Sequence, residues 1–286
     1  MNVQRKVAYV LALPAVIVLV ASVIFPLLFS INVAIRKYDL RVPTEDYPFI
    51  GPENFTRAIY DPYFLSSLLI TFEFIILGIA LQFSIGFAVA ILLNKIKWRR
   101  YILPAIAIPA LTPPIVAGYM GIILFHTDGV VNFFLNLLGV ASKIPWYSSP
   151  ETALLTCVLI DTWQWYPFIS LILLAGILSI PVDYIEAAKI DGASELSILR
   201  HIILPMLRGI IAIALIFRIL EMLRVFDVIY IVTHGGPGTA TQVTNFYSYL
   251  VGFRYWDLGY ASAIGWILVV ILSVFVTYYM KLFKVS

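Results

Sequence analysis

Long apolar runs without charge dominate this sequence, and they decide the solvent in which the chain can fold. The run from Val7 to Ile35 contains no charged residue, whereas a helix needs only about 20 apolar residues to cross a membrane. Hydrophobic residues make up 62% of the chain and charged residues 12%, against roughly 45–50% and about 25% in soluble domains. A soluble fold could not bury so much apolar surface, so the surrounding solvent must be largely lipid.

Six stretches of the chain are apolar enough to cross a membrane. Backbone polar groups in lipid must be satisfied internally, and these runs lack the alternation of barrel strands, so we expect helices. The predicted fold class is an all-α integral membrane protein with six transmembrane helices in one domain, 1–286. The expected spans cover about 7–35, 63–94, 101–125, 151–178, 209–232 and 256–282.

The first span and the flanking charges predict the orientation. The apolar part of a signal peptide is about 7–15 residues long, so the longer run after Lys6 indicates a retained helix. With the N-terminus placed in the cytosol, Lys and Arg are more frequent in the inside segments, for example at Lys95, Arg99 and Arg100, than in the outside segments. The positive-inside rule therefore predicts that both termini are cytoplasmic.

Several classes of function are excluded by composition. A net charge of +3 gives no basic surface for nucleic acid. The single cysteine, Cys157, lies in an apolar run and is interpreted as a small buried residue, which excludes a disulfide framework or a multi-cysteine metal site. The three histidines lack ligand spacing. No glycine-rich run ends in Lys-Ser or Lys-Thr, so the chain cannot hydrolyse ATP itself.

The segment 179–208, between the fourth and fifth spans, is longer than a connector needs to be. Ser179 is expected to cap a short helix that Pro181 helps to start, and Gly192 to end it. Ser194 is expected to cap a second short helix, which Pro205 ends before the fifth span. An amphipathic connector resting on lipid headgroups and a docking surface for a partner both fit. The second helix is expected to carry an apolar stripe of Leu196, Leu199, Ile203 and Leu204. On the first helix, Tyr184, Ala187, Ala188 and Asp191 fall on one side at helical spacing, and the alanines are small enough to let another surface come close.

Ionisable residues inside spans are costly and usually face a cavity or a partner. The fifth span holds Arg218, Glu221, Arg224 and Asp227 at three-residue spacing. In a continuous helix this spacing places them on one face, with alternating signs that allow neighbours to pair. A structural ladder of ion pairs and a polar face lining a pathway are both consistent with this pattern.

The fourth span carries an aromatic and polar cluster, Asp161, Trp163, Gln164 and Trp165. Aromatic faces stack on sugar C–H surfaces, while amides and carboxylates bind sugar hydroxyls, so the cluster suits a carbohydrate site. An aromatic belt at the membrane interface is the alternative. In the second span, Glu73 and Gln82 are expected to form hydrogen bonds between helices.

Within the 179–208 segment, one motif resembles a known family. Glu186-Ala187-Ala188, then Gly192, then Ile202-x-Leu204-Pro205 matches the "EAA" loop of ABC importer permeases, and Asp191-Gly192-Ala193 matches the carbohydrate-uptake branch. The chain resembles the larger type of sugar permease subunit, as in maltose, trehalose and glycerol-phosphate uptake. The resemblance implies a type I ABC importer permease fold in the plasma (inner) membrane of a prokaryote.

In that family the loop is a coupling helix that sits in a cleft of the cytosolic ATPase. The resemblance therefore implies a polar role for Glu186 at the cleft and close approach at the small residues. One position departs from the family's pattern, because many relatives have Phe where this chain has Leu199. The ATPase-coupling residues implied by the resemblance are Glu186, Ala187, Ala188, Asp191, Gly192, Ala193 and Leu199.

Two further matches extend the resemblance over nearly the whole chain. The segment 224–237 and the run Gly259–Ala263 resemble sugar-permease signatures, and the outside loop 36–62 carries Gly51-x-x-Asn54-Phe55 after Tyr38. The substrate-pathway residues expected from the spans and these matches are Asp161, Trp163, Gln164, Trp165, Arg218, Glu221, Arg224, Asp227, Tyr260 and Ser262.

The resemblance also implies a set of partners. They are a second permease subunit, two copies of an ABC ATPase subunit, an extracytoplasmic sugar-binding protein, a sugar substrate and membrane lipid. The chain itself is expected to bind no cofactor and to be no enzyme, with ATP and Mg on the partner ATPase. Alternatives are an importer for glycerol phosphate, a self-contained secondary transporter using the intramembrane charges as a proton relay, and an intramembrane enzyme, for which no motif is present.

Overall fold

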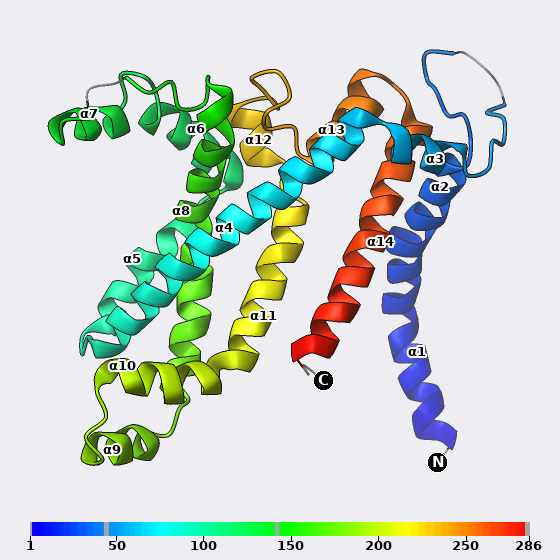
Figure 1. Cartoon of the computed structure of the whole chain (residues 1–286). Helices are drawn as coiled ribbons and strands as arrows, with labels where there is room; N and C mark the ends of the chain where they lie inside the picture. Colours follow the sequence, from blue (N-terminus) through cyan, green and yellow to red (C-terminus); the bar gives the residue numbers. More distant parts are fainter. Residues whose placement is uncertain (1, 43–45, 141–142, 284–286) are drawn as a thin grey trace. The chain divides into compact units, whose positions relative to one another are not determined.

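The structure, a computed structural model, describes residues 2–42, 46–140 and 143–283, and the described chain is mostly helical (Figure 1). It divides into two compact units. Unit 1 comprises Met1–Leu65 and Tyr247–Ile271, and unit 2 comprises Ser66–Phe246 and Leu272–Ser286. Five helices in the described part are long and apolar enough to span a membrane, or six if one bent pair forms a single span. This confirms the expected fold class.

The elements follow the apolar runs closely at most positions. In chain order they are α1 (Asn2–Leu19), η1 (Val20–Ile24), α2 (Phe25–Ala34), α3 (Glu53–Tyr60), α4 (Pro62–Lys95), α5 (Arg99–Leu111), α6 (Pro114–Leu124), α7 (Val130–Leu137), α8 (Pro150–Leu178), α9 (Val182–Ile190), α10 (Glu195–Ile198), η2 (Leu199–Ile203), α11 (Leu204–Leu223), α12 (Asp227–Val232), α13 (Thr244–Tyr249), η3 (Leu250–Arg254) and α14 (Leu258–Phe283), where η marks a π-helical turn.

The third expected span is a broken helix. The axes of α5 and α6 differ by 91° across the break between Leu111 and Pro114. Thr112 has an extended ψ of 128°, as expected for a residue before a proline, where the pyrrolidine ring disfavours helical backbone. The consecutive prolines Pro113 and Pro114 therefore divide the predicted span into two helices.

The fifth span begins and ends earlier than predicted. The apolar helix runs over Glu195–Leu223, rather than 209–232, and a break separates α11 from α12. At the break, the N–H groups of Arg224 and Val225 donate to carbonyls three residues back, which tightens the last turn. The Asn245 side-chain amide donates to the Arg224 carbonyl at 3.1 Å, a group that a continuing helix would have bonded itself.

The 179–208 segment forms the predicted helix, glycine turn and second helix, with two corrections. Gly192 has φ +79°, and the Ser194 hydroxyl accepts from the Ser197 N–H at 3.3 Å, as expected. Ser179 does not cap α9; its hydroxyl donates to the Gly176 carbonyl at 2.8 Å and so belongs to the end of α8. Pro205 does not end the second helix, because the π-helical turn η2 rearranges the bonding around the missing proline N–H.

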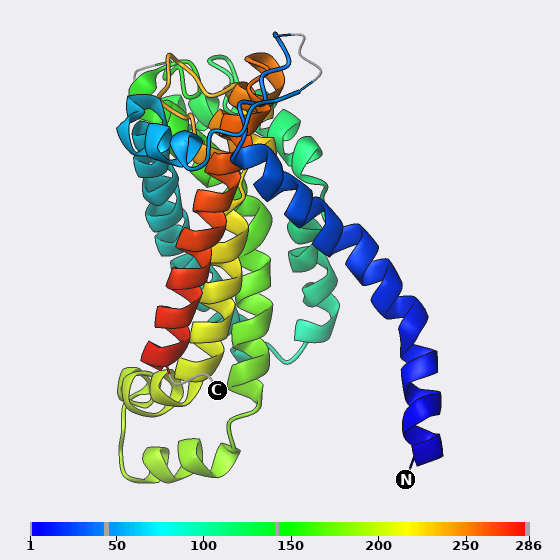
Figure 2. The same ribbon diagram turned by 90° about the vertical axis from the view of Figure 1, so that its right-hand side faces the viewer.

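Within unit 2, α8 and α11 run side by side, and α9 lies beyond the ends of both (Figures 1 and 2). The central part of α8 is the most buried of the candidate spans, with 61% of its apolar window covered. The aliphatic core around it includes Leu173, Leu207 and Ala90 from α8, α11 and α4. This packing joins three helices that all carry intramembrane polar groups.

Within unit 1, the first outside-loop motif packs against the start of α14. The buried Asn54 amide donates to the carbonyls of Ala34 and Arg36 at 2.8 and 3.0 Å. Gly259 donates its N–H to the Tyr38 carbonyl at 3.1 Å. A Cβ at Gly259 would lie 2.5 Å from the Arg36 carbonyl oxygen, so only glycine fits there. The outside-loop motif around Asn54 and the run Gly259–Ala263 therefore pack against each other in one contact.

We predict that Gly259→Ala destabilises the protein by about 2 kcal/mol or more, because a backbone carbonyl, rather than a flexible side chain, must move. Gly265→Ala in the same helix is the control, since a Cβ there meets nothing within 4 Å. The measurement is the thermal unfolding midpoint of each variant in detergent. Equal midpoints for the two variants would show that the contact at Gly259 is not tight.

Candidate functional site

A buried ionic cluster joins three helices of unit 2. Arg218 of α11 donates from Nη2 to Asp161 Oδ2 of α8 at 2.9 Å and from Nε to Gln82 Oε1 of α4 at 2.8 Å. Gln82 Nε2 donates to the same Asp161 oxygen at 2.7 Å. The exposed fractions are 2% for Arg218, 7% for Asp161 and 0% for Gln82. We call Arg218, Asp161 and Gln82 the central triad. It confirms the interhelical hydrogen bond expected of Gln82.

The expected ladder along the fifth span is not formed as one continuous face. Arg218 pairs with Asp161 on another helix, and only Glu221 and Arg224 pair within the segment. Because α11 ends at Leu223, Asp227 belongs to α12 and does not continue the helical spacing. Among the described residues, no basic side chain lies within ion-pair distance of Asp227. Helical spacing is informative only while the helix continues, which explains the error.

A pocket of about 100 Å³ opens beside the central triad and contains most of the predicted pathway residues. A second hollow of about 200 Å³ shares Trp165, Arg218 and Glu221 with it and adds Phe168 and Phe217. We call the two together the pathway pocket. Its first part is lined by Pro114, Asp161, Gln164, Trp165, Arg218, Glu221, Arg224, Val225, Phe226, Asp227 and Val228.

Neighbouring side chains of α8 have separate roles around this pocket. The Trp165 ring lies 4.8 Å from the Arg218 guanidinium carbon, which combines an aromatic face with a cation. Gln164 donates to the Thr112 carbonyl at 2.7 Å and so holds the break between α5 and α6. Trp163 is 37% exposed and is absent from the lining of the pathway pocket. Alternation around the helix therefore separates Trp163 from the other predicted aromatic residue.

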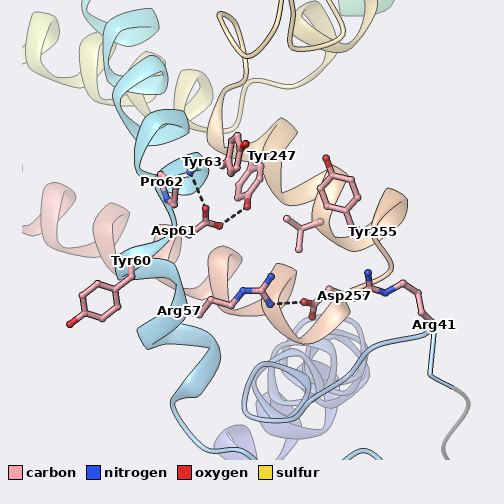
Figure 3. A pocket seen from close by; sticks show the side chains of 10 residues that line it. Arg41, Arg57, Tyr60, Asp61, Pro62, Tyr63, Tyr247, Tyr255 and Asp257 are labelled. Atoms are coloured by element: carbon pink, nitrogen blue, oxygen red, sulfur yellow. Dashed lines mark hydrogen bonds and ion pairs between the residues drawn. The ribbon is translucent and has the colours of Figure 1, made fainter.

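Tyr260 lies in a different cluster, within unit 1; Figure 3 labels four other members of this cluster, Asp61, Tyr247, Arg57 and Asp257. The Tyr260 hydroxyl donates to Asp61 Oδ2 at 2.6 Å, and the Tyr247 hydroxyl donates to the same oxygen at 2.5 Å. Arg57 lies 4.0 Å above the Tyr260 ring and pairs with Asp257 at 2.7 Å. We call Asp61, Tyr247, Tyr260, Arg57 and Asp257 the Asp61 cluster. Tyr260 is fully buried in it, and Ser262, also expected to line the pathway, is absent from the lining of the pathway pocket.

The Asp61 cluster was not expected from the sequence, because no spacing links Asp61 with residues nearly two hundred positions away. Burial raises the pKa of the Asp61 carboxyl, but the two tyrosine hydroxyls and the Tyr63 N–H stabilise the charged form and hold the pKa below its usual value. Burial and the adjacent carboxylate raise the pKa of Tyr247. The cluster lines an open cavity of about 520 Å³. In the sequence, the local sign of this cluster is only that an acidic residue, Asp61, stands between Tyr60 and Pro62.

The predicted ATPase-coupling residues divide between two surfaces. Glu186, Ala187, Asp191 and Gly192 are exposed, and no described residue of the chain covers them. Leu199 is half-buried and lines a cavity of about 500 Å³ between the 179–208 segment and the ends of α4 and α8. Ala188 and Ala193 are half-buried as well. Among the predicted coupling residues, the exposed ones on α9 and in its glycine turn are therefore free to receive another surface.

No group of three or more potential metal-ligating side chains lies close together among the described residues. The polar side chains that line the pathway pocket are carboxylates, guanidinium groups and an amide. Such groups bind hydroxyl-bearing or ionic molecules by hydrogen bonding.

We predict that Arg218→Met alone destabilises the protein by about 3–5 kcal/mol, because it leaves the Asp161 carboxylate buried without a counter-charge. The double variant Asp161→Asn/Arg218→Met removes both charges and should be markedly more stable than the single variant. The measurement is the fraction that stays monodisperse in detergent after heating. A double variant no more stable than Arg218→Met would show that the two charges are not coupled.

The comparisons with known proteins agree with this arrangement. The model of the family described as "Binding-protein-dependent transport system inner membrane component" matches residues 82–284. The chain is similar to the trehalose/maltose transport system permease protein MalF of Thermococcus litoralis, with 33% identity over 97% of this chain and 94% of the relative.

Two solved structures share the fold over almost the full length. One is a bacterial ABC transporter involved in the import of the acidic polysaccharide alginate (TM-score 0.85, 22% identity, covering 98% of this chain and 96% of that chain). The other is the bacterial alginate transporter in complex with an alginate pentasaccharide-bound periplasmic protein (TM-score 0.83, 22% identity, 97% and 94%). The family match and the first relative lead to one conclusion: this chain belongs to the family of inner membrane components of binding-protein-dependent transport systems.

Proposed function

We propose that the chain is one half of the translocation pathway of an ATP-driven, binding-protein-dependent sugar importer. The observation that carries the proposal is the pathway pocket, in which an aromatic face, carboxylates and an amide converge within a membrane-spanning unit. This combination suits sugars, whose C–H faces stack on aromatic rings and whose hydroxyls bind carboxylates and amides. The similar trehalose/maltose permease and the similar alginate transporter support a carbohydrate substrate.

The second part of the proposal is that α9 receives the force of ATP binding. The exposed face of α9 is suited to insertion into a cleft of a partner ATPase, and Gly192 leads from it into α10. From Glu195 to Leu223 the chain forms one helix. Arg218 lies about 35 Å along this helix from Glu195, at 1.5 Å per residue. A displacement of α9 would therefore be transmitted along this continuous helix to the pathway pocket.

The proposed partners follow from the separate roles of α9 and the pathway pocket. Two ATPase subunits would bind ATP and Mg and perform hydrolysis, while this chain is the non-catalytic permease. A second permease would supply the other wall of the pathway. An extracytoplasmic binding protein would deliver the sugar, as the periplasmic protein bound to the alginate transporter suggests. We place the chain in the cytoplasmic membrane of a prokaryote with both termini in the cytosol.

A self-contained secondary transporter is the competing function. Its proton relay would need intramembrane groups that can change charge during the cycle. Arg218 and Asp161 are instead fixed to each other and to Gln82, which opposes such a relay. Reconstitution of the chain alone separates the two functions, since sugar uptake without ATP and without an ATPase would favour the relay.

We predict that Glu186→Lys lowers uptake and binding-protein-stimulated ATP hydrolysis at least tenfold in the assembled transporter, because it reverses a charge on the exposed α9 face. Glu186→Gln, which removes the charge but keeps the length, should have a smaller effect. Copurification of the ATPase with each variant controls for assembly. Full transport by Glu186→Lys would exclude the proposed coupling role.

We also predict that Trp165→Ala raises the KM for sugar uptake by about tenfold, which corresponds to about 1.4 kcal/mol of lost binding. Trp163→Ala is the matched control, because it removes the same side chain from the same helix outside the pathway pocket. Uptake rates are measured over a range of sugar concentrations, with assembly checked by copurification. Equal effects of the two substitutions would argue against stacking at Trp165.

A further inference from the structure

The charged side chains of the pathway pocket do not balance. Its lining contains three carboxylates, from Asp161, Glu221 and Asp227, and two guanidinium groups, from Arg218 and Arg224. The described residues of the pocket therefore contribute a formal charge of minus one. Whether this charge matters to a substrate depends on which groups are already engaged within the protein.

The guanidinium group of Arg218 already has partners within the protein. Its Nε and Nη2 donate to Gln82 and Asp161, and its guanidinium lies against the Trp165 ring. Asp161 accepts from both Arg218 and Gln82 on one oxygen, an arrangement that fits the ionised form. With 2% of Arg218 exposed, its charge is neutralised inside the wall and is poorly placed to bind an anion.

The second arginine is also paired, although closer to the surface. Arg224 Nη2 donates to Glu221, and both side chains are more than half exposed. An anionic ligand would have to compete with Glu221 for this guanidinium. Asp227 has no such partner among the described residues, and its carboxylate is exposed on the same pocket. The unbalanced charge is therefore the negative charge of Asp227.

From these contacts we infer that the pathway pocket selects neutral sugars over sugars that carry a carboxylate, sulfonate or phosphate group. The inference rests on the proposed function and narrows its substrate class. Asp227 accepts hydrogen bonds from sugar hydroxyls, Trp165 stacks on the sugar, and the same Asp227 repels an anion. A phosphorylated substrate such as glycerol phosphate is thereby disfavoured. Asp227 is the specificity-determining residue.

The first test measures the charge preference of the pocket without any substrate. Val225→Cys places a thiol in the pocket lining, and the native Cys157 is buried and so does not compete. The variant, in the assembled transporter, is treated with a cationic and an anionic methanethiosulfonate reagent of similar size. We expect the ratio of the cation rate to the anion rate to be at least tenfold higher at Val225→Cys than at Thr239→Cys. Thr239 is an exposed loop position of the same unit.

Adding Asp227→Asn to the Val225→Cys variant should remove most of this preference, because it removes the unpaired carboxylate without changing side-chain size. The same ratio of cation rate to anion rate at Val225→Cys and at Thr239→Cys would overturn the inference. A preference that persists in Asp227→Asn would exclude Asp227 as its source.

The second test uses matched substrates in proteoliposomes that contain the complete transporter and its binding protein. Maltose and maltobionate have nearly the same size, but maltobionate carries a carboxylate. We expect a neutral disaccharide to be imported and the corresponding aldonate to be imported at least tenfold more slowly. Faster import of an acidic sugar would overturn the inference while the proposed function stands. Unimpaired transport by Glu186→Lys would instead count against the proposed function.

Discussion

The buried contact between Arg218 and Asp161 constrains the arrangement of unit 2 more than any other interaction. An unpaired charge in this environment is costly, and removing one partner of a buried pair typically costs about 3–5 kcal/mol. Gln82 bonds both partners, so α4, α8 and α11 must hold one register for all three groups to be satisfied. Apolar packing alone would tolerate small slips of these helices. The central triad does not, and it therefore fixes the geometry of the pathway pocket beside it.

The same helix that supplies Arg218 also begins within the 179–208 segment, so one continuous helix connects this segment with the pathway pocket. Pro205 would break an ordinary α-helix, because it lacks an N–H group. Here the π-helical turn Leu199–Ile203 lies directly before it, and the Leu204 N–H bonds the Leu199 carbonyl. The helix thereby continues through the proline. A connector of independent short helices would have absorbed a displacement of α9, whereas a continuous helix transmits it.

Many local features of this protein could be predicted from the sequence, although the Ser179 cap and the helix end at Pro205 were wrong. Features that depend on distant residues could not be predicted. The solvent argument predicted the spans, and Gly192 and Ser194 form the expected turn and cap, because their conformations depend on adjacent residues. The end of α11 depends on Asn245, which bonds the Arg224 carbonyl from another element. The Asp61 cluster depends on Tyr247 and Tyr260. Neither contact has a spacing that a sequence pattern could reveal.

The break after Leu223 also bears on which charge of the pathway pocket is left unpaired. In a continuous helix, Arg224 and Asp227 would be neighbours at three-residue spacing and would be expected to pair. In the structure α11 ends at Leu223, the Asn245 amide bonds the Arg224 carbonyl beyond it, and Asp227 is the first residue of α12. Arg224 pairs with Glu221, and no described basic side chain pairs with Asp227. The end of α11 thus separates Asp227 from the helical spacing that would have continued the row of ion pairs, and among the described residues its carboxylate has no ion-pair partner. The selectivity that we infer for neutral sugars therefore depends on a backbone feature and on Asp227 together.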